Sequence, residues 1–219
     1  MWTQLPPQKY QHKEFHDKHG NRLEATFDST AGRMLSLSGL KANIKDYGLS
    51  QADLNESSVL DAGKKFLHDY GFVAGIDSDQ AVKKDIRNNK GMGWFVQCRQ
   101  AYHKVPIDGS DIRFLIHRSG EFRLFEATTF SNINIPTNPP VSGSDALTIV
   151  KNENKDAELK FGNGPELVIY PKKNAKAYQY YLAWVIYVLR TTPHTIDGFK
   201  YVIDAQNGDI IENIKQGES

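Results

Sequence analysis

The sequence has little of three features that would indicate a particular compartment or partner. Its 219 residues include one cysteine, Cys98, which excludes an internal disulfide. No apolar run approaches the roughly 20 residues that a membrane-spanning helix needs. Lysine and arginine total 27 against 26 aspartates and glutamates, so no overall field favours nucleic acid, a membrane or acidic substrates. We therefore expect a soluble globular protein with no nucleic-acid or membrane partner.

The N-terminus also lacks a secretory signal. Met1–Gln4 has neither a basic start nor an apolar stretch behind it. The residues themselves leave two alternatives open, a cytosolic chain or the trimmed form of a longer protein.

Common catalytic motifs are missing as well. The sequence contains no Gly-x-Ser-x-Gly, His-Glu-x-x-His, P-loop or Gly-x-Gly-x-x-Gly pattern. His68, His103, His117 and His194 are scattered along the chain. A pair of glycosidase-type carboxylates can be distant in sequence, but no pattern here indicates one. These absences favour a binding, inhibitory or folding module over an enzyme, with no catalytic residues and no cofactor.

The weak metal candidates are three histidines near the N-terminus, His12, His16 and His19. Histidines at i and i+4 can share a helix face, and three imidazoles suit zinc. The segment has poor helix signals, however, and it runs into Gly20-Asn21. We therefore expect a solvated polar arm over residues 1–21 and no metal site. A small metal-binding protein or hydrolase that uses this arm is the alternative.

Cys98 lies in a strand-like run. A nucleophilic cysteine needs a nearby base and a lowered pKa. His103 is five residues away, so on a strand it falls on the opposite face. A small residue packed in the core is the predicted role.

What the sequence does contain is a strongly strand-like region near its C-terminus. In the run from Tyr180 to Leu189, apolar and aromatic residues occupy both alternating faces, which predicts a strand buried on both sides. A hairpin follows, in which Asp204-Ala-Gln-Asn-Gly208 joins two more strands and Asn207-Gly208 supplies positive φ. Trp184 is predicted to be a buried core residue.

The N-terminal half repeats a related order. Residues 22–27 and 34–37 alternate as two strands of a hairpin, and Val59 to Tyr70 has helical spacing that ends at Gly71. Ser58 with Asp61 resembles a capping box. The strand-like segments that follow cover residues 80–87, 94–103, 112–117 and 122–129.

A polar, proline-bearing linker over residues 131–144 separates this half from a second helix that begins near Ser142 and Asp145. The order of helix and then antiparallel strands thus occurs twice, with only short local matches between the copies. We expect the α+β class, with two cystatin-like lobes, each a helix on an antiparallel sheet, preceded by an N-terminal β-hairpin. The expected divisions are an arm at 1–21, a first lobe at 22–140 and a second lobe at 141–219.

An ordered set of motifs resembles a known family. Residues 96–110, with Gln100 and Tyr102 before Val105-Pro106 and a Gly109-Ser110 turn, are similar to the propeptide (FTP) motif of fungalysins and thermolysins. In the second half, 166–171, Leu182-Ala-Trp184 and Ile203-Asp204-Ala-x-x-Gly208 resemble a PepSY domain. Two positions depart from the family pattern: Gln97 replaces its usual arginine and Lys104 its glycine.

The resemblance implies a prosegment of a secreted zinc metallopeptidase. Such prosegments inhibit the peptidase and assist its folding, and the partner would be a thermolysin-like catalytic domain in cis in the precursor. The implied location is extracellular, after removal of a signal peptide. The family-motif residues Gln100, Tyr102, Pro106, Gly109, Trp184, Asp204 and Gly208 would then be structural. The expected partner contacts are Ile214, Lys215, Gln216, Gly217, Glu218 and Ser219. The alternative is a PepSY-type protein-binding module of a secreted multidomain protein with no peptidase partner.

Overall fold

The computed structural model describes residues 10–28, 33–174 and 177–217. Contacts divide the chain into two units, of which unit 1 comprises Met1–Lys104 and Gly109–Ser131. Unit 2 comprises Val105–Asp108 and Asn132–Ser219. The expected boundary after residue 140 falls in the segment between the last strand of unit 1 and the first helix of unit 2. The assignment of Val105–Asp108 to unit 2 was not foreseen, because these residues follow a unit 1 strand directly in sequence.

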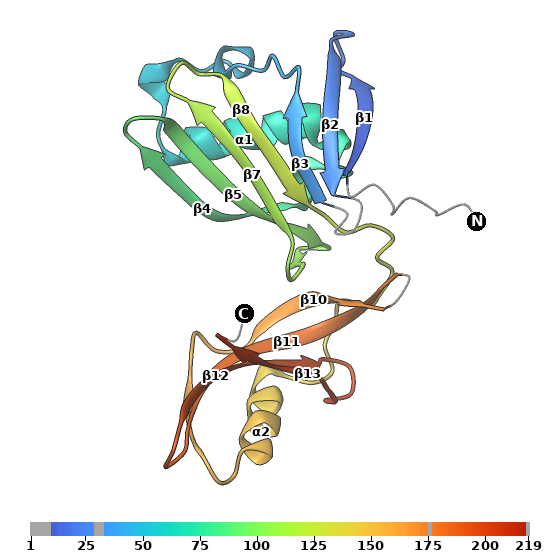
Figure 1. Cartoon of the computed structure of the whole chain (residues 1–219), viewed down its shortest axis with the longest axis vertical. Coiled ribbons are helices and arrows are strands. Elements are labelled where there is room, and N and C mark those ends of the chain that lie inside the picture. The colour runs from blue at the N-terminus through green and yellow to red at the C-terminus, as the bar shows by residue number, and fades with distance from the viewer. Residues whose placement is uncertain (1–9, 29–32, 175–176, 218–219) are drawn as a thin grey trace, which may run out of the picture. The chain divides into compact units, whose positions relative to one another are not determined.

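Unit 1 contains an antiparallel sheet with the strand order β1-β2-β3-β8-β7-β5-β4 (Figure 1). The strands are β1 (Tyr10–His16), β2 (Arg22–Asp28), β3 (Arg33–Ser38), β4 (Ala81–Asn89), β5 (Gly93–Tyr102), β7 (Asp111–His117) and β8 (Phe122–Thr128). The expected hairpin strands are confirmed as β2 and β3, and the turn between them lies outside the described residues. The prediction of a loose arm was wrong for residues 10–16, since β1 pairs with β2 from Tyr10↔Asp28 to His16↔Arg22. Its exposed, polar composition is that of an edge strand.

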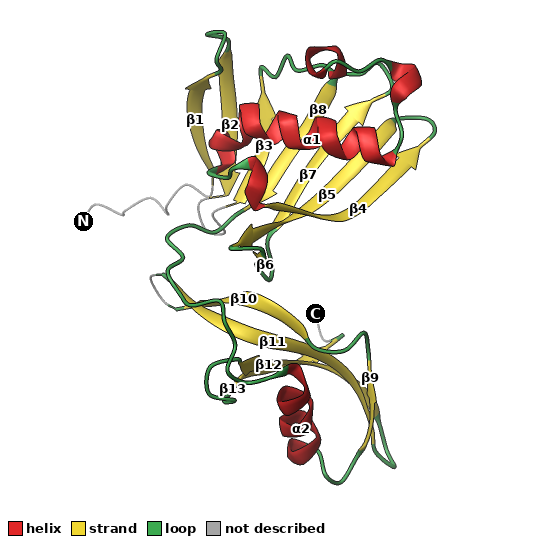
Figure 2. Cartoon of the chain, turned by 180° about the vertical axis from the view of Figure 1, so that it is seen from behind, coloured by secondary structure: helices red, strands yellow, loops and turns green. Residues whose placement is uncertain are grey.

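One helix, α1 (Glu56–Tyr70), crosses a single face of this sheet (Figure 2). Its cap is Asn55, whose side chain accepts hydrogen bonds from the Ser57 and Ser58 amides. The predicted cap at Ser58 was therefore three residues late, because Asn55 is an equally good acceptor just upstream. Short 3₁₀ turns flank the helix: η1 (Ile44–Tyr47), η2 (Gln51–Asp53), η3 (Gly71–Ala74) and η4 (Ser78–Gln80).

The core of unit 1 lies between α1 and the sheet and is built around Phe66. The Phe66 ring is fully buried and stacks on Phe122 with centroids 4.3 Å apart. Phe114 and Phe125 contact the same ring, at 5.5 and 5.2 Å. Gly63 faces Phe114 so closely that an added Cβ would lie 2.3 Å from the ring. The missing side chain at Gly63 is therefore what lets the helix approach the sheet.

Unit 2 has a second antiparallel sheet with the order β10-β11-β12-β13, and β9 also pairs with β11. Its elements are β6 (Val105–Pro106), α2 (Gly143–Glu153), β9 (Glu158–Phe161), β10 (Glu166–Lys173), β11 (Tyr178–Thr191), β12 (Ile196–Asp204) and β13 (Ile210–Gln216). The helix α2 packs on one face of this sheet (Figures 1 and 2). Two antiparallel sheets, each with one α-helix on one face, place the chain in the α+β class; the cystatin-like detail stays a prediction.

The predicted start of α2 is confirmed. The Ser142 hydroxyl accepts from the Asp145 amide, and the Asp145 carboxylate accepts from the Ser142 amide, which is a complete capping box. At the other end of the helix, buried Asn154 donates to the Tyr201 hydroxyl at 2.9 Å and to the Val150 carbonyl at 2.8 Å. This polar pair fixes the end of α2 against the central strand β12.

The hairpin between β12 and β13 forms as expected, with one difference. The Asp204 carboxylate accepts from the Gln206 amide at 2.7 Å, and Gly208 has φ +84°. Asn207 does not have positive φ, so the turn needs only one left-handed residue rather than two.

Within the described residues, every helix is too short or too polar to cross a membrane.

Candidate partner-binding surface

The long strand β11 divides unit 2 into two faces. Ile186 and Val188 pack with the α2 residues Ala146 and Val150. The alternate residues of β11 point to the opposite side of the sheet, which we call the open face. Its character changes along the strand, and that change defines the candidate site.

At one end the open face is buried. Val168, Ala183, Val185 and Val202 form a cluster in which each is at most 1% exposed. The segment that begins with β6 lies along β10, where the Asp108 amide donates to the Ile169 carbonyl at 2.9 Å. Ile107 beside it is fully buried.

A line of charged and hydroxyl groups closes this buried end. Lys200 Nζ lies 2.6 Å from Asp108 Oδ2 and 5.5 Å from the centroid of the Tyr170 ring. The Tyr170 hydroxyl donates to Glu212 at 2.6 Å. Burial, together with the Glu212 carboxylate that the hydroxyl contacts, raises the pKa of Tyr170 well above its ordinary value. Tyr170 therefore stays a neutral donor, and each of these groups is satisfied within unit 2.

At the other end, the same face exposes four large apolar side chains, which we call the apolar strip. Tyr187 and Leu189 are each 47% exposed, Ile196 is 72% exposed and Ile214 is 37% exposed. The register places Tyr187 and Leu189 near Ile196, which pairs with Thr191, two residues beyond Leu189. Ile214 lies on the same face across Lys200, which is the cross-strand partner of both Tyr187 and Ile214. Isolated exposed apolar residues are common, but adjacent ones mark interaction sites.

Glycine at position 198 leaves this strip open. Gly198 is the cross-strand partner of both Leu189 and Gln216. A Cβ at Gly198 would lie 3.8 Å from Leu189 Cδ2, in ordinary contact. Any side chain there would therefore cover part of Leu189, whereas glycine leaves the leucine accessible to a partner.

The predicted partner contacts lie partly on this surface. Ile214 belongs to the apolar strip, while Lys215 and Gln216 complete the exposed strand β13. Gly217 follows with φ +93°, and Glu218 and Ser219 lie outside the described residues. The first three of the expected partner contacts, Ile214, Lys215 and Gln216, therefore belong to the paired edge strand β13.

Sequence reasoning missed the rest of the strip. The prediction that β11 is buried on both faces holds for Leu182, Ala183, Val185, Ile186 and Val188. Trp184 is half-buried, and the prediction was wrong for Tyr187 and Leu189. Apolar alternation cannot distinguish a covered face from an exposed one. The sequence does contain one indication that Leu189 is exposed, the glycine at position 198, which lies opposite Leu189 in the sheet. This glycine can be interpreted only once the register of β11 and β12 is known.

Four of the family-motif residues are in or beside β5. Gln100 is buried, and its side chain donates to the Phe130 carbonyl at 2.9 Å and accepts from the Phe130 amide at 2.7 Å. Tyr102 ends β5 half-buried, Pro106 lies in β6, and Gly109 adopts φ +74°. Gln100 thus has a clear structural role, since it holds the segment after β8 with both ends of its amide.

The other three motif residues belong to unit 2. Trp184 is half-buried rather than fully buried, packs against the α2 cluster and donates from Nε1 to the Val141 carbonyl at 2.8 Å. Asp204 and Gly208 build the β12–β13 turn described above, in which the Gly208 amide donates to the Asp204 carbonyl at 2.9 Å. All three act on the fold and none belongs to the apolar strip.

The two departures from the family pattern have structural explanations. The Gln97 side chain donates to Asp111, which also pairs with Arg113, so Gln97 joins a polar row across β5 and β7. Lys104 has φ +70° and follows His103 at φ +48° in the turn after β5. Glycine adopts this conformation without strain, which accounts for a glycine in the family pattern at that position.

The three candidate histidines do not come together. His12 and His16 lie four residues apart on β1, which spaces them roughly 13 Å along the strand. The Nδ1 atom of His12 contacts Thr26 at 3.2 Å instead, and His19 lies in the following turn. Among the residues that the structure describes, no group of three histidine, cysteine or acidic side chains could hold a metal ion.

Cys98 is a core residue, as its strand pattern indicated. Its side chain is 3% exposed, in the cluster under α1. Burial raises the pKa of the Cys98 thiol to about 11. A thiol with this pKa is almost wholly protonated at neutral pH and is a poor nucleophile.

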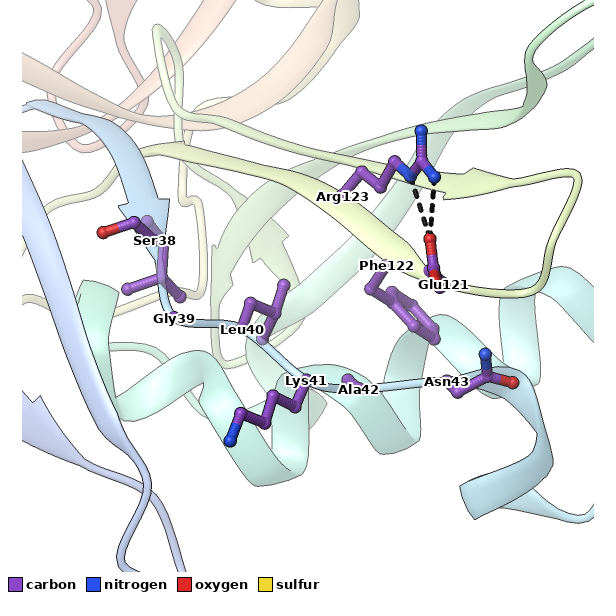
Figure 3. Close-up of a pocket in the computed structure, with 10 residues that line it drawn as sticks. Ser38, Gly39, Leu40, Lys41, Ala42, Asn43, Glu121, Phe122 and Arg123 are labelled. Carbon is purple, nitrogen blue, oxygen red and sulfur yellow. Dashed lines mark hydrogen bonds and ion pairs between the residues drawn. The ribbon is translucent and has the colours of Figure 1, made fainter.

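A surface pocket in unit 1 is a second candidate (Figure 3). It lies where β3 and β8 separate, since their pairing covers only Arg33↔Thr128 and Met34↔Ala127. Its cavity volume is about 550 Å³. The charged groups at its rim are occupied: Arg123 donates to Glu121 at 2.8 Å, and Lys41 donates to Asn21 at 3.3 Å. These charged side chains are thus paired within unit 1, and we take the apolar strip as the stronger candidate.

Comparison with known proteins adds little. No protein-family model matches the sequence, and no curated protein matches it. Among solved structures, the C-terminal domain of Bacillus megaterium YpeB aligns with 97% of this chain and 92% of its own, at 13% identity and a TM-score of 0.38. At this level the likeness defines neither a family nor a function.

Proposed function

We propose that the chain is a non-catalytic protein-binding module whose contact surface is the apolar strip together with β13. The observation that carries the proposal is the change along the open face, from valines that are fully covered to four large apolar residues that are accessible. Burying such side chains against a partner is favourable, at about 25 cal/mol per Å² of apolar surface removed from water. Aromatic anchors such as Tyr187 are typical of interaction hot spots.

The resemblance of its motifs to peptidase prosegments suggests the finer form of this function. In that form the chain inhibits a thermolysin-like zinc metallopeptidase and assists its folding. Docking would favour the native peptidase by mass action, at high effective concentration while both are parts of one precursor. No side chain of this chain would need to take part in chemistry.

The test is a titration of the whole chain into a thermolysin-like catalytic domain, followed by the rate of peptide hydrolysis. The expected result is slower hydrolysis at micromolar chain, with the inhibition constant weakened at least about tenfold by Ile214→Lys, since a tenfold change corresponds to about 1.4 kcal/mol. Met92→Lys is the matched control, because Met92 is 51% exposed but lies in the β4–β5 turn of unit 1. An unchanged rate at excess chain would exclude the inhibitor form.

The same two variants test the coarser proposal. If a different partner is found, its affinity should fall with Ile214→Lys and remain with Met92→Lys. Equal effects of the two variants would show that the strip is not the contact surface. A partner that is not a peptidase would favour the PepSY-type alternative.

A further inference from the structure

We propose that the partner presents an extended segment that pairs with β13 as an additional strand of the unit 2 sheet. This inference rests on the proposed binding function and adds its mode: main-chain hydrogen bonds at the β13 edge, with one face of the added strand lying beside the apolar strip. The recognised chemistry is an uncharged extended segment with alternating apolar side chains.

The outer strands of the two sheets differ in how they are protected against such pairing. Soluble proteins blunt edges with charges, irregularities or covering segments. In unit 1, β1 carries Lys13 and Glu14 among exposed positions, and β4 carries Lys84 and a register shift in its pairing with β5. In unit 2, β10 is flanked by a parallel bridge between Ile107 and Ile169.

Strand β13 also carries two charged residues, Glu212 and Lys215, and a register shift in its pairing with β12, but both charges are paired within unit 2. Its sequence, Ile-Ile-Glu-Asn-Ile-Lys-Gln, contains three isoleucines and no proline. The register shift leaves Ile211 as the extra residue, and the Ile211 carbonyl accepts a hydrogen bond from Lys172 Nζ at 3.1 Å. Strand β13 is seven residues long, and its Ile210 and Ile214 side chains are each 37% exposed.

The two charges of β13 are neutralised within unit 2. Glu212 accepts the Tyr170 hydroxyl at 2.6 Å and lies 3.9 Å from Lys172 Nζ. Lys215 Nζ lies 3.3 Å from Asp197 Oδ1. An incoming strand would therefore meet no unpaired charge that repels it or demands a partner, and this is why an uncharged segment fits.

The geometry also fixes which side chains of the partner matter. The register of β12 and β13 runs from Ile203↔Ile210 to Gly198↔Gln216, so a strand of similar length can be added. Side chains alternate between the two faces of a sheet. The residue opposite Ile214 would extend the apolar strip, so a large apolar side chain is expected there. Its immediate neighbours would point to the α2 side and contribute less.

The experiment is hydrogen exchange of the β13 amides in the whole chain, by NMR. About half of these amides point away from β12 and should exchange rapidly in the free protein. Two probes are added: a zinc-depleted thermolysin-like catalytic domain, and a capped peptide of alternating valine and threonine as long as β13. Strand addition slows the outward amides at least about tenfold. Docking through side chains alone leaves their exchange unchanged.

Matched peptides distinguish main-chain hydrogen bonding from non-specific hydrophobic binding. In one peptide, the alternate amides that would face β13 are N-methylated, which removes hydrogen-bond donors and keeps the peptide backbone away from β13. In the other peptide, the remaining alternate amides are methylated, and the edge that faces β13 is unchanged. Since the facing set is not known beforehand, both are made. Loss of amide protection with only one of the two sets supports strand addition. Equal loss or equal retention with both overturns it.

The outcomes also distinguish this inference from the proposed function. Binding of the catalytic domain without slower exchange in β13 overturns strand addition and leaves the binding function standing. Protection by the peptide but no binding of the catalytic domain supports strand addition and excludes the peptidase-inhibitor form. No protection by either probe overturns strand addition.

Discussion

The two units place one helix on one antiparallel sheet but use the sheet differently. In unit 1 one continuous cluster lies between α1 and the sheet, centred on stacked aromatic rings. In unit 2 the buried residues fall into two smaller clusters, one under α2 and one on the open face. The helices differ accordingly, with 15 residues in α1 and 11 in α2.

This difference teaches where a partner can be accommodated. In unit 1 the apolar face of the sheet is covered by α1 and buried in one core. A sheet that is apolar on both faces, with one short helix, has more apolar surface than its own chain covers. The apolar strip of unit 2 is that remainder, and the following variants test the contrast, from the largest expected effect to the smallest.

The largest loss should come from Phe66→Ala in unit 1. Phe66 is fully buried and contacts four other aromatic rings, so removing it should lower the free energy of unfolding by about 3–5 kcal/mol. Hydrogen exchange of β7 and β8 amides measures the effect. Phe72→Ala is the control, since Phe72 is 46% exposed, and should cost well under half as much. Similar losses for both would mean that unit 1 has no dominant aromatic core.

In unit 2 the matching variant is Trp184→Ala, with a smaller expected loss of about 2–3 kcal/mol. Trp184 is only half-buried, so less apolar contact is lost than for a fully buried ring, together with the bond to Val141. Trp184→Phe keeps most of the packing and should cost about 1 kcal/mol for the missing donor. A loss as large as that of Phe66→Ala, measured by chemical denaturation, would remove the contrast between the two cores.

Acid should weaken the attachment of the β1–β2 turn in unit 1. Burial alone would raise the pKa of Asp17, but hydrogen bonds from the Asn21 side chain and from the Asn21 and His19 amides lower it below its ordinary value. A lowered folded-state pKa contributes stability above the ordinary aspartate pKa of about 3.9, and that stability is lost as the pH falls through the folded pKa.

The measurement is the free energy of unfolding of unit 1 as a function of pH, with Asp17→Asn as the variant. At neutral pH the variant should lose about 1–2 kcal/mol, because hydrogen bonds to a charged acceptor are the stronger kind. Below the folded pKa the difference should shrink. A constant difference across the acid range would show that the carboxylate charge is not what holds the turn.

The smallest effects should come from the helix caps. Ser142→Ala and Asn55→Ala each remove a side chain that caps a helix, and each should cost about 1 kcal/mol. Because α2 is the shorter helix and packs on a smaller cluster, exchange protection should fall along more of α2 than of α1. Equal local losses in the two helices would indicate that their tertiary support is equivalent.

Much of the secondary structure could be predicted from local chemistry. The hairpin strands β2 and β3, the body of α1, the Ser142 cap of α2 and the Asp204–Gly208 turn each depend on residues close in sequence. The errors occurred where two nearby residues could both cap a helix, or where the structure of a segment depends on pairing with another strand. The helix α1 is capped by Asn55 rather than by Ser58. The segment β1 is a strand because it pairs with β2, which its own residues do not indicate.

The candidate site was less predictable. Ile214 to Gln216 were expected to contact a partner because of a family resemblance, and their residue types gave no independent indication. Tyr187 and Leu189 were expected to be buried because their alternation matches that of a covered strand. Their exposure follows from the register, which sets Gly198 between Leu189 and Gln216, and from the position of α2 on the other face of the unit 2 sheet.

The sequence by itself determined the class of the fold and the positions of its helices and turns, because periodicity, capping and turn chemistry act over a few residues. The tertiary structure decided which apolar faces are covered and which are left open. Coverage depends on segments far apart in the chain, such as Ile107 beside Ile169 and α2 against β12. Two stretches of β11 with the same apolar alternation therefore differ in exposure: Ala183 and Val185 are buried, whereas Tyr187 and Leu189 are exposed.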